Sequence, residues 1–347
     1  MQTFATAVRV LRIELVVIVA LFMSILAVGA LYQFMGARRS ARSCRPPGTM
    51  VDVGGHRLHV VCAGIGSPTV VFESGIAASS LSWTRVLPGV AQFTRACAYD
   101  RAGLAWSEAP RGPRTIAQTL GDLHRLLLNA AITGPYVLVG HSFGAFLVCA
   151  YASRHPDDIA GLVLLDPPSE WRQVTREQKR LLLGGIQLSR VGGILARLGV
   201  VRACLALLSG GSPGVPRNFV KVFGPTVART LERLVGEVRK LPADVHPIVQ
   251  AHWCQPKCFR ALADYLGSLE ETAAFVSGLT SLPNVPLVVI SSGDQPPEVA
   301  AEHQRIARLS LQSRHIVLRT GGHWIPFDDP DLVVTTVREV VDRAAAS

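Results

Sequence analysis

The nine residues Val137–Ala145, VLVGHSFGA, carry the strongest structural signal in the chain. A β-branched apolar run passes through Gly-x-Ser-x-Gly directly into a segment with helical spacing. In so tight a strand-to-helix turn the serine must take a strained backbone conformation, and Gly140 and Gly144 leave space where a Cβ would meet neighbouring backbone. The turn places the Ser142 hydroxyl at a helix start, where the Phe143 amide can stabilise an oxyanion. The alternative is a plain or phosphate-binding glycine turn.

Short apolar strands and helical segments alternate on both sides of this turn. The later strands are continuous apolar runs, as in a parallel sheet covered on both faces. We therefore predict an α/β fold with a mostly parallel, doubly wound sheet. The expected strands are 57–62, 69–72, 95–99, 136–139, 162–165, 286–291 and 315–318, and the expected helices are 115–129, with Thr115 as its cap, 143–154, 298–309 and 330–344.

Residues 167–285 interrupt this alternation. They contain helical patterns, pairs of glycines and few strand signals. We expect them to form a helical cap over the carboxyl edge of the sheet, where open α/β sheets bind their ligands. The predicted organisation is an N-terminal anchor and linker at 1–45, a sheet core at 46–166 and 286–347, and the cap at 167–285.

A nucleophilic serine needs a base, and the base needs an acid to orient it. His323 lies between the last predicted strand and the last helix, and Asp294 follows the strand at 286–291. The order serine, acid, histidine is typical of one hydrolase arrangement, and each residue stands just past the carboxyl end of its strand. Asp166, which ends the strand after the serine turn, is the alternative acid. We expect His141 to support the turn and the remaining histidines to be structural.

Together these motifs resemble the α/β-hydrolase superfamily, in its esterase and lipase-like group with an inserted cap. The resemblance covers about residues 50–166 and 286–345 and says nothing informative about the cap. It rests on the matching pieces VVFESG (70–75), YDRAGLAWS (99–107), GHSFG (140–144), LLD (164–166), SGD (292–294) and Gly322-His323.

The resemblance implies a role for each matching residue. Ser142 would be the nucleophile, His323 the base and Asp294 the acid, with the amides of Phe143 and Ile76 forming the oxyanion hole. Dehalogenases and epoxide hydrolases of this fold need a carboxylate where this chain has the serine, so the serine favours acyl transfer to water.

One departure affects the oxyanion hole. Many family members carry His-Gly after the third strand, where this chain has Ser74-Gly75 preceded by Glu73. The second backbone donor is therefore Ile76 or its neighbour Ala77.

These features predict a serine hydrolase that cleaves a carboxylic ester through an acyl-enzyme, without a cofactor. Apolar runs in the cap favour a lipophilic substrate, although these leucines could equally pack the cap's own core; they are Leu181–Leu183, Ile194–Leu195 and Leu205–Leu208. The alternatives are an amidase, a C–C bond hydrolase or an acyltransferase with the same triad, or a catalytically silent ligand receptor on the same fold.

The stretch Leu15–Met35 has 21 residues and no charge, which suffices to span a bilayer as a helix. We expect a retained single-pass anchor in a membrane protein. Val28–Ala30 resembles a signal cleavage site, so secretion after cleavage is the alternative. The arginines that follow the span would place the next domain in the cytoplasm, although Arg9 and Arg12 partly balance them.

The formal charge of +10 is concentrated in two segments. Residues 1–45 carry +5 and residues 167–285 carry +7, whereas 46–166 and 286–347 carry 0 and −2. Basic residues beside an anchor are attracted to anionic lipid, so we expect the cap to face the bilayer. This distribution and the lack of a binding motif argue against a nucleic-acid partner.

The seven cysteines give weaker signals. Cys62, Cys97 and Cys149 lie in apolar segments that predict core positions. Cys254 and Cys258 could form a zinc half-site with His252 nearby, or a local disulfide, but no second pair completes a metal site, and we expect no metal. Their odd number means that at least one cysteine is unpaired within the chain.

Overall fold

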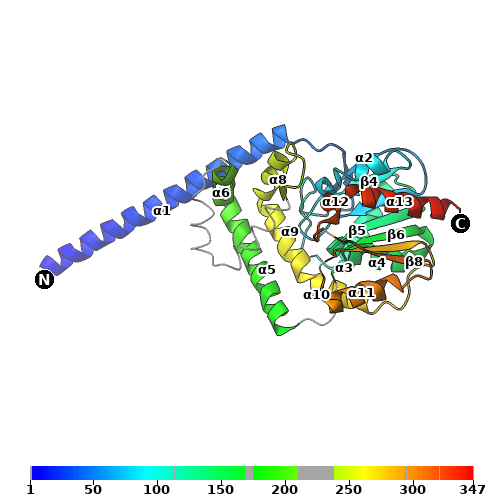
Figure 1. The fold of residues 1–347 in the computed structure, drawn as a ribbon. Helices are drawn as coiled ribbons and strands as arrows, with labels where there is room; N and C mark the ends of the chain where they lie inside the picture. Colours follow the sequence, from blue (N-terminus) through cyan, green and yellow to red (C-terminus); the bar gives the residue numbers. More distant parts are fainter. Residues whose placement is uncertain are drawn as a thin grey trace.

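The computed structural model describes residues 2–112, 114–168, 175–209, 238–293, 295–319 and 321–346. Its centre is an eight-stranded sheet in the order β1-β2-β4-β3-β5-β6-β7-β8 (Figure 1). β1 and β2 are antiparallel to their neighbours and all other pairs are parallel, which confirms the predicted sheet. The strands are β1 Thr49–Asp52, β2 Arg57–Ala63, β3 Thr69–Glu73, β4 Ala96–Tyr99, β5 Tyr136–His141, β6 Ile159–Leu165, β7 Leu287–Ser291 and β8 Ser313–Val317. Only the short edge strand β1 was not predicted, because it lacks an apolar run.

Helices cover both faces of the sheet. Along β3, Val70 and Phe72 belong to one core cluster and Val71 to the other, as the two-residue period of a strand requires. The first cluster lies under α2 (Leu87–Val90) and α13 (Pro330–Ala345). The second lies under α3 (Ile116–Asn129), α4 (Phe143–Arg154), α10 (Leu269–Ser277) and α11 (Pro297–Ala307).

Local signals set the helix ends where they were predicted. The Thr115 hydroxyl accepts a hydrogen bond from the Gln118 amide, and the Gln118 side chain accepts one from the Thr115 amide. This reciprocal cap satisfies amides that the first turn of α3 leaves unpaired. α4 begins immediately after Ser142 and ends before His155-Pro156, because the residue before a proline disfavours helix.

The regular elements described between β6 and β7 are all helices. They are α5 (Arg176–Arg197), α6 (Val200–Ser209), α8 (His246–Trp253), α9 (Pro256–Gly267) and α10. α5 packs along α9, and α9 is tied to the loop after β4 (Figure 1). Lys257 Nζ donates to the carbonyls of Ala105 (2.7 Å) and Ser107 (2.8 Å), and the Tyr265 hydroxyl donates to that of Ala102. α10 packs on α4 and joins the main core.

Helix α1 (Gln2–Ser43) protrudes far from the rest of the molecule (Figure 1). The most apolar 18 residues within its segment Leu11–Ser43 have a mean hydropathy of 2.7, and none of them is buried. This segment is long and apolar enough to cross a membrane. The second half of α1 contacts the domain, through α5, α6 and α8. There the buried Gln33 side chain donates to the carbonyl of Cys254 (2.8 Å).

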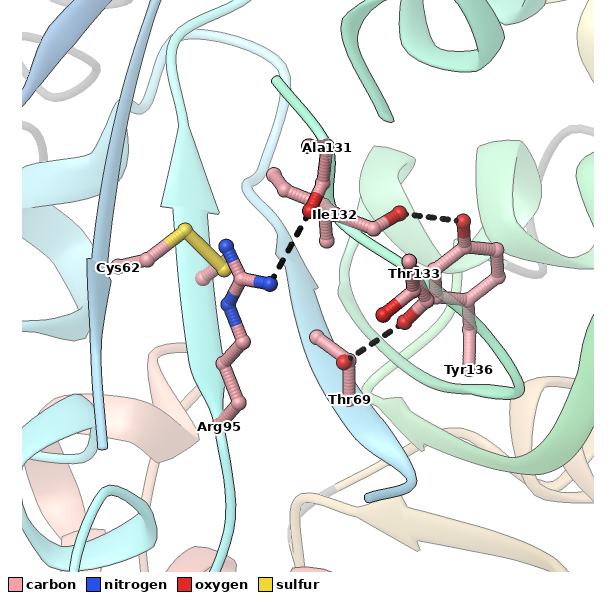
Figure 2. The surroundings of a disulfide bond; sticks show 8 residues. Cys62, Thr69, Arg95, Ala131, Ile132, Thr133 and Tyr136 are labelled. Atoms are coloured by element: carbon pink, nitrogen blue, oxygen red, sulfur yellow. Dashed lines mark hydrogen bonds between the residues drawn. A yellow bond between two sulfur atoms is a disulfide. The ribbon is translucent and has the colours of Figure 1, made fainter. Parts of the chain in front are cut away.

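A disulfide joins Cys62 on β2 to Cys97 on β4 (Figure 2). The two residues are direct partners in the antiparallel register. The core prediction holds for Cys97 but is wrong for Cys62, which is exposed because it lies on the open face of an outer strand. Next to it, Arg95 Nη1 donates to the carbonyl of Ala131 (3.2 Å), so the loop before β5 is fixed to β4.

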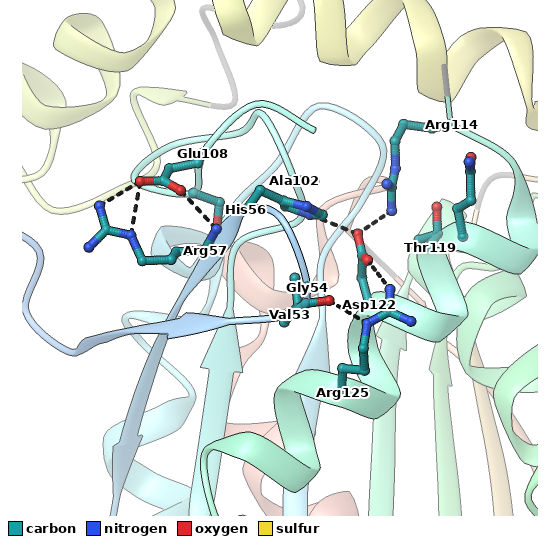
Figure 3. Close-up of polar contacts among 12 residues, drawn as sticks. Val53, Gly54, His56, Arg57, Ala102, Glu108, Arg114, Thr119, Asp122 and Arg125 are labelled. Carbon is teal, nitrogen blue, oxygen red and sulfur yellow. Dashed lines mark hydrogen bonds and ion pairs between the residues drawn. The ribbon is translucent and has the colours of Figure 1, made fainter. Parts of the chain in front are cut away.

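A second polar cluster fixes the start of the domain to α3 (Figure 3). The buried carboxylate of Asp122 on α3 accepts hydrogen bonds from His56, Arg114 and Arg125. Arg125 also donates to the carbonyl of Val53. The cluster therefore holds the β1–β2 turn against α3.

Candidate active site

The serine turn has the strained geometry that the sequence predicts. Ser142 has φ 53° and ψ −124°, a left-handed conformation that costs a non-glycine residue about 1–3 kcal/mol. A Cβ on Gly140 would lie 2.6 Å from the Gly144 carbonyl oxygen, and one on Gly144 would lie 2.3 Å from that of Glu73. Both positions therefore require glycine. The Ser142 amide donates to the carbonyl of Leu165 (2.8 Å), which holds the turn at the end of β5 beside β6.

The structure brings His323 to Ser142. His323 Nε2 lies 2.9 Å from Ser142 Oγ, and His323 Nδ1 lies 2.6 Å from Asp166 Oδ2. Because the ionised carboxylate can only accept, Nδ1 carries the ring proton and Nε2 accepts the serine proton. The three side chains form one directed chain of hydrogen bonds from nucleophile to acid.

The acid in contact with the histidine is the alternative residue, Asp166. The first choice, Asp294, lies outside the described residues. Asp166 sits immediately after β6, and β6 is the direct neighbour of β5 in the sheet. In the parallel register Leu165 pairs with His141, so Asp166 and Ser142 leave adjacent strand ends at the same level.

Hydrogen bonds saturate the Asp166 carboxylate. Oδ2 faces His323, and Oδ1 accepts from the Ser292 amide (3.0 Å), the Ser292 hydroxyl (3.3 Å) and the Gln295 side chain. Burial on its own would raise the pKa of Asp166, but the hydrogen bonds from His323 and Ser292 outweigh it and hold this pKa below its ordinary value. The carboxylate therefore stays ionised and can stabilise an imidazolium on His323.

A buried chain of polar groups lies behind the acid. His303 Nε2 is 2.6 Å from the carbonyl of Pro167, and Ser291 Oγ lies 2.6 Å from His303 Nδ1 and 2.7 Å from His315 Nε2. One proton order satisfies every contact, with His315 donating to Ser291, Ser291 to His303 and His303 to Pro167. This chain, which sequence reasoning missed, fixes the backbone that follows Asp166.

His141, in the serine turn, is fully buried. Its Nε2 donates to the backbone carbonyl of His323 (2.8 Å), so it positions the loop that carries the base. Burial, with a smaller contribution from the nearby His323 ring, lowers the pKa of His141 to about 3, and the ring is neutral near pH 7. The His141 ring therefore contacts the loop that carries the base, and its support of the turn itself stays a prediction.

The loop after β3 carries the second expected oxyanion donor. Arg101 reaches across this loop and donates to Glu73 and to the carbonyls of Ser74 (2.6 Å), Gly75 and Ile76 (3.0 Å). With its carbonyls held by the guanidinium, the loop keeps one fixed path past the serine turn. In the described part of the chain, no hydrogen-bond acceptor contacts the Ile76 amide.

The unusual Glu73 is explained by this clamp. Its carboxylate is buried and pairs with Arg101 and with the Tyr99 hydroxyl. Burial raises the pKa of Glu73, while Arg101 and Tyr99 oppose this shift. Asp100 has a structural role, because it accepts from the Ser80 amide (2.8 Å) and pairs with His59 Nδ1 (2.9 Å).

The two cysteines at 254 and 258, for which a local disulfide was one possibility, are not bonded. Cys254 and Cys258 are both buried free thiols, and burial raises the pKa of Cys258 to about 11. Among the described residues, the group that could hold a metal ion is a different one, formed by His124, His155 and Asp158, with ligand atoms within 4.8 Å of one another. It lies at the amino end of β6, at the opposite edge of the sheet from Ser142.

Comparison with known proteins agrees with this geometry. Residues 68–191 match the model of the α/β-hydrolase fold family. A thermophilic esterase from Thermogutta terrifontis superposes with a TM-score of 0.59 at 22% identity, over 85% of this chain and 98% of the esterase. This chain has the α/β-hydrolase fold. Epoxide hydrolase and enol-lactonase structures have similar folds, so the fold alone does not assign the reaction.

Two curated relatives extend the comparison. The uncharacterised protein YqjL of Bacillus subtilis is 26% identical over 278 residues, which are 78% of this chain and 83% of YqjL. A probable transporter, efuK of Hormonema carpetanum, is 35% identical over 130 residues, which are 35% of this chain and 19% of that protein. This chain therefore aligns with most of one relative and with about a fifth of the other.

Proposed function

We propose that this α/β-hydrolase is a serine hydrolase that cleaves a carboxylic ester through an acyl-enzyme on Ser142. The observation that carries the proposal is the hydrogen-bonded chain from Ser142 Oγ through His323 to Asp166, with distances of 2.9 and 2.6 Å. In this proposal the acid is Asp166. A serine nucleophile with a paired base is the arrangement that acyl transfer needs.

Each residue has a defined step. His323 Nε2 takes the Ser142 proton as Oγ attacks the ester carbonyl, and the imidazolium that forms is stabilised by Asp166. The amides of Phe143 and Ile76 bind the oxyanion, at roughly 3 kcal/mol per donor. His323 then returns its proton to the leaving alcohol. In the second half the same nitrogen deprotonates water, which attacks the acyl-enzyme and releases the acid and the free serine.

A membrane anchor and a lipophilic substrate fit the rest of the molecule. α1 continues without a break through the possible cleavage site at Val28–Ala30, and its last turns are docked on the domain through Gln33. This supports retention of the anchor. Leu181 and Leu183 on α5 are exposed, which argues against the explanation that the apolar runs pack only the cap's own core.

The test is hydrolysis of short p-nitrophenyl esters by the purified full-length chain and by Ser142→Ala. We expect the substitution to lower kcat by about 10⁴-fold or more, because only the oxyanion donors and substrate binding remain. Ser153→Ala, on the same helix with its hydroxyl bound only to the Ala150 carbonyl, is the matched control and should keep full activity. Undiminished hydrolysis by Ser142→Ala would refute the proposal.

A further inference from the structure

The position of the cap along α1 sets its depth in a membrane. The uncharged stretch Leu15–Met35 is bounded by Glu14 and Arg38, so a span of about 20 residues can shift very little. The corner between α5 and α6 touches this stretch backbone to backbone. A Cβ on Gly29 would lie 2.3 Å from the carbonyl oxygen of Leu198. Gly29 precedes Met35 by six residues, about 9 Å along a helix, so the corner lies inside the apolar span.

Polar contacts lie next to this corner, on the side toward the C-terminal end of α1. Their position agrees with a membrane surface near the end of the apolar span. Arg202 on α6 donates through Nε to Gln33 (2.9 Å) and through Nη1 to Ser40 Oγ (3.3 Å). Gly36 lies between them, and a Cβ there would be 2.5 Å from the Arg202 side chain. The guanidinium thus extends along α1 toward its charged flank, as basic side chains do when they reach from apolar surroundings to water.

α5 has an apolar face without a partner among the described residues. One face is buried toward α9 through Leu182, Ser189, Gly192 and Ala196. Five large apolar side chains of α5 are 48–58% exposed, and four of them recur at spacings of seven, three and three residues; the five are Leu181, Leu183, Leu188, Val191 and Ile194, with Leu183 outside that spacing. Figure 1 shows α5 at the edge of the domain from which α1 protrudes, running across α1 rather than beside it. With α1 across a bilayer, α5 lies along its surface.

We propose that α5 and the α5–α6 corner are embedded in the leaflet that α1 leaves, with the exposed face of α5 among the lipid acyl chains. The occupant of this face is phospholipid, because the face is continuous through Leu198 with the span of α1. The charge of +7 on residues 167–285 and the presence of Arg190 and Arg197 on α5 complement anionic headgroups. A lipophilic ester could then enter from the leaflet.

This inference rests on the proposed anchoring role of α1 and goes beyond ester cleavage. It is tested on full-length protein in phosphatidylcholine and phosphatidylglycerol vesicles, with Cys44 and Cys204 replaced by serine. A fluorescent thiol label is placed by Leu188→Cys or Val191→Cys on α5, by Phe22→Cys within α1, and by Leu311→Cys. Leu311 is 92% exposed in the turn before β8, far from α5, and is the matched control.

We expect lipids with doxyl groups on their acyl chains to quench the labels at positions 22, 188 and 191, and aqueous iodide to quench only the label at 311. Iodide quenching at 188 and 191 with lipid quenching at 22 would overturn the proposal and leave the anchor intact. Protection from both quenchers at 188 and 191 would indicate a protein partner and would equally overturn it. If lipid did not quench the label at position 22, both the membrane-anchoring role of α1 and this proposal would be contradicted. Fluorophosphonate labelling of Ser142 in the same samples tests the hydrolase function separately.

A functional readout uses Leu188→Lys with Val191→Lys, against Leu311→Lys as control. We expect the double variant to lose about tenfold or more in hydrolysis of an ester dissolved in the vesicles, and to keep the hydrolysis of a short water-soluble ester. Equal activity of both variants on the vesicle ester would contradict the proposal. A parallel loss on both esters would also contradict it, since it would reflect damage to the fold.

Discussion

The carboxylate of Asp166 makes hydrogen bonds to two different loops. Oδ2 binds His323, and Oδ1 binds the loop that follows β7. Its backbone is left-handed, with φ 46°, a conformation that aspartate tolerates better than most residues. Strand order brings Asp166 beside the serine turn, because β6 is the direct neighbour of β5. The sequence motifs predicted Ser142, His323 and both candidate acids, but each acid follows a strand of the same sheet, so spacing alone could not choose between them.

We predict that Asp166→Asn lowers kcat by about 10⁴-fold, because an amide no longer enforces the tautomer with the proton on Nδ1. Asp294→Asn should lower kcat by less than about tenfold. Ester hydrolysis by the two variants, at equal fractions folded by circular dichroism, measures the difference. A large loss in Asp294→Asn with near-normal activity in Asp166→Asn would return the role of acid to Asp294.

His141 makes stability depend on pH. Its pKa is about 3 in the folded protein and ordinarily near 6.5, so between these values the unfolded chain binds the extra proton. The stability that the neutral His141 ring contributes to the folded protein is fully present above pH ~6.5, and it is lost as the pH falls toward 3. We predict that the free energy of unfolding of wild type decreases by a few kcal/mol from pH 6.5 to 4, and that His141→Gln has a flatter dependence. Parallel urea-unfolding curves for the two proteins over this range would contradict the prediction.

Among the secondary-structure elements, the loop after β3 is held in place by the side chain of Arg101, which follows β4. Arg101 holds three successive carbonyls of the loop, and its charge is balanced by the buried Glu73. The sequence motif YDRAGLAWS does not reveal a partner for Arg101. β3 and β4 are adjacent in the sheet, and only that adjacency brings Glu73 to Arg101.

We predict that Glu73→Ala destabilises the protein by about 3–5 kcal/mol, because it leaves the Arg101 charge buried without its partner. Glu108→Ala is the control. It removes the exposed pair with Arg57 and should cost less than about 1 kcal/mol. The free energies of unfolding in urea give both values. Equal small losses would mean that the Arg101 clamp adds little to stability.

Apolar periodicity predicted seven of the eight strands, since those strands are buried in a layered sheet. It predicted α1 as well, although the helix extends past the uncharged stretch to Ser43. The packing of α5 on α9, and hence which cap leucines stay exposed, was not predictable. It depends on which face of a Leu-rich helix meets a neighbour, and the pattern RLLLGGIQLSRVGGIL offers apolar residues on more than one face.

For the whole molecule, two features bear on the side of the membrane. The arginines after the span favour a cytoplasmic domain, whereas the Cys62–Cys97 disulfide favours an oxidising compartment, because cytosolic thiols are kept reduced. The arginine bias is opposed by Arg9 and Arg12, so the disulfide is the stronger of the two signals.

We therefore predict that the domain lies outside the cytoplasm. In intact cells carrying Cys204→Ser, a membrane-impermeant maleimide should label Cys44, which is partly exposed just after α1, whereas Thr3→Cys with Cys44 and Cys204 both replaced by serine should be labelled only after lysis. The opposite pattern would place the domain in the cytoplasm, and Cys62 and Cys97 should then be recovered as free thiols.

The catalytic account depends on a nucleophilic Ser142. The most direct measurement is peptide mass spectrometry of the full-length protein after reaction with a fluorophosphonate. The account predicts one stoichiometric adduct on Ser142, slowed by about 10³-fold or more in His323→Gln, because the base no longer takes the serine proton. Ester hydrolysis by pure protein without an adduct on Ser142, or with the adduct on another residue, would contradict it.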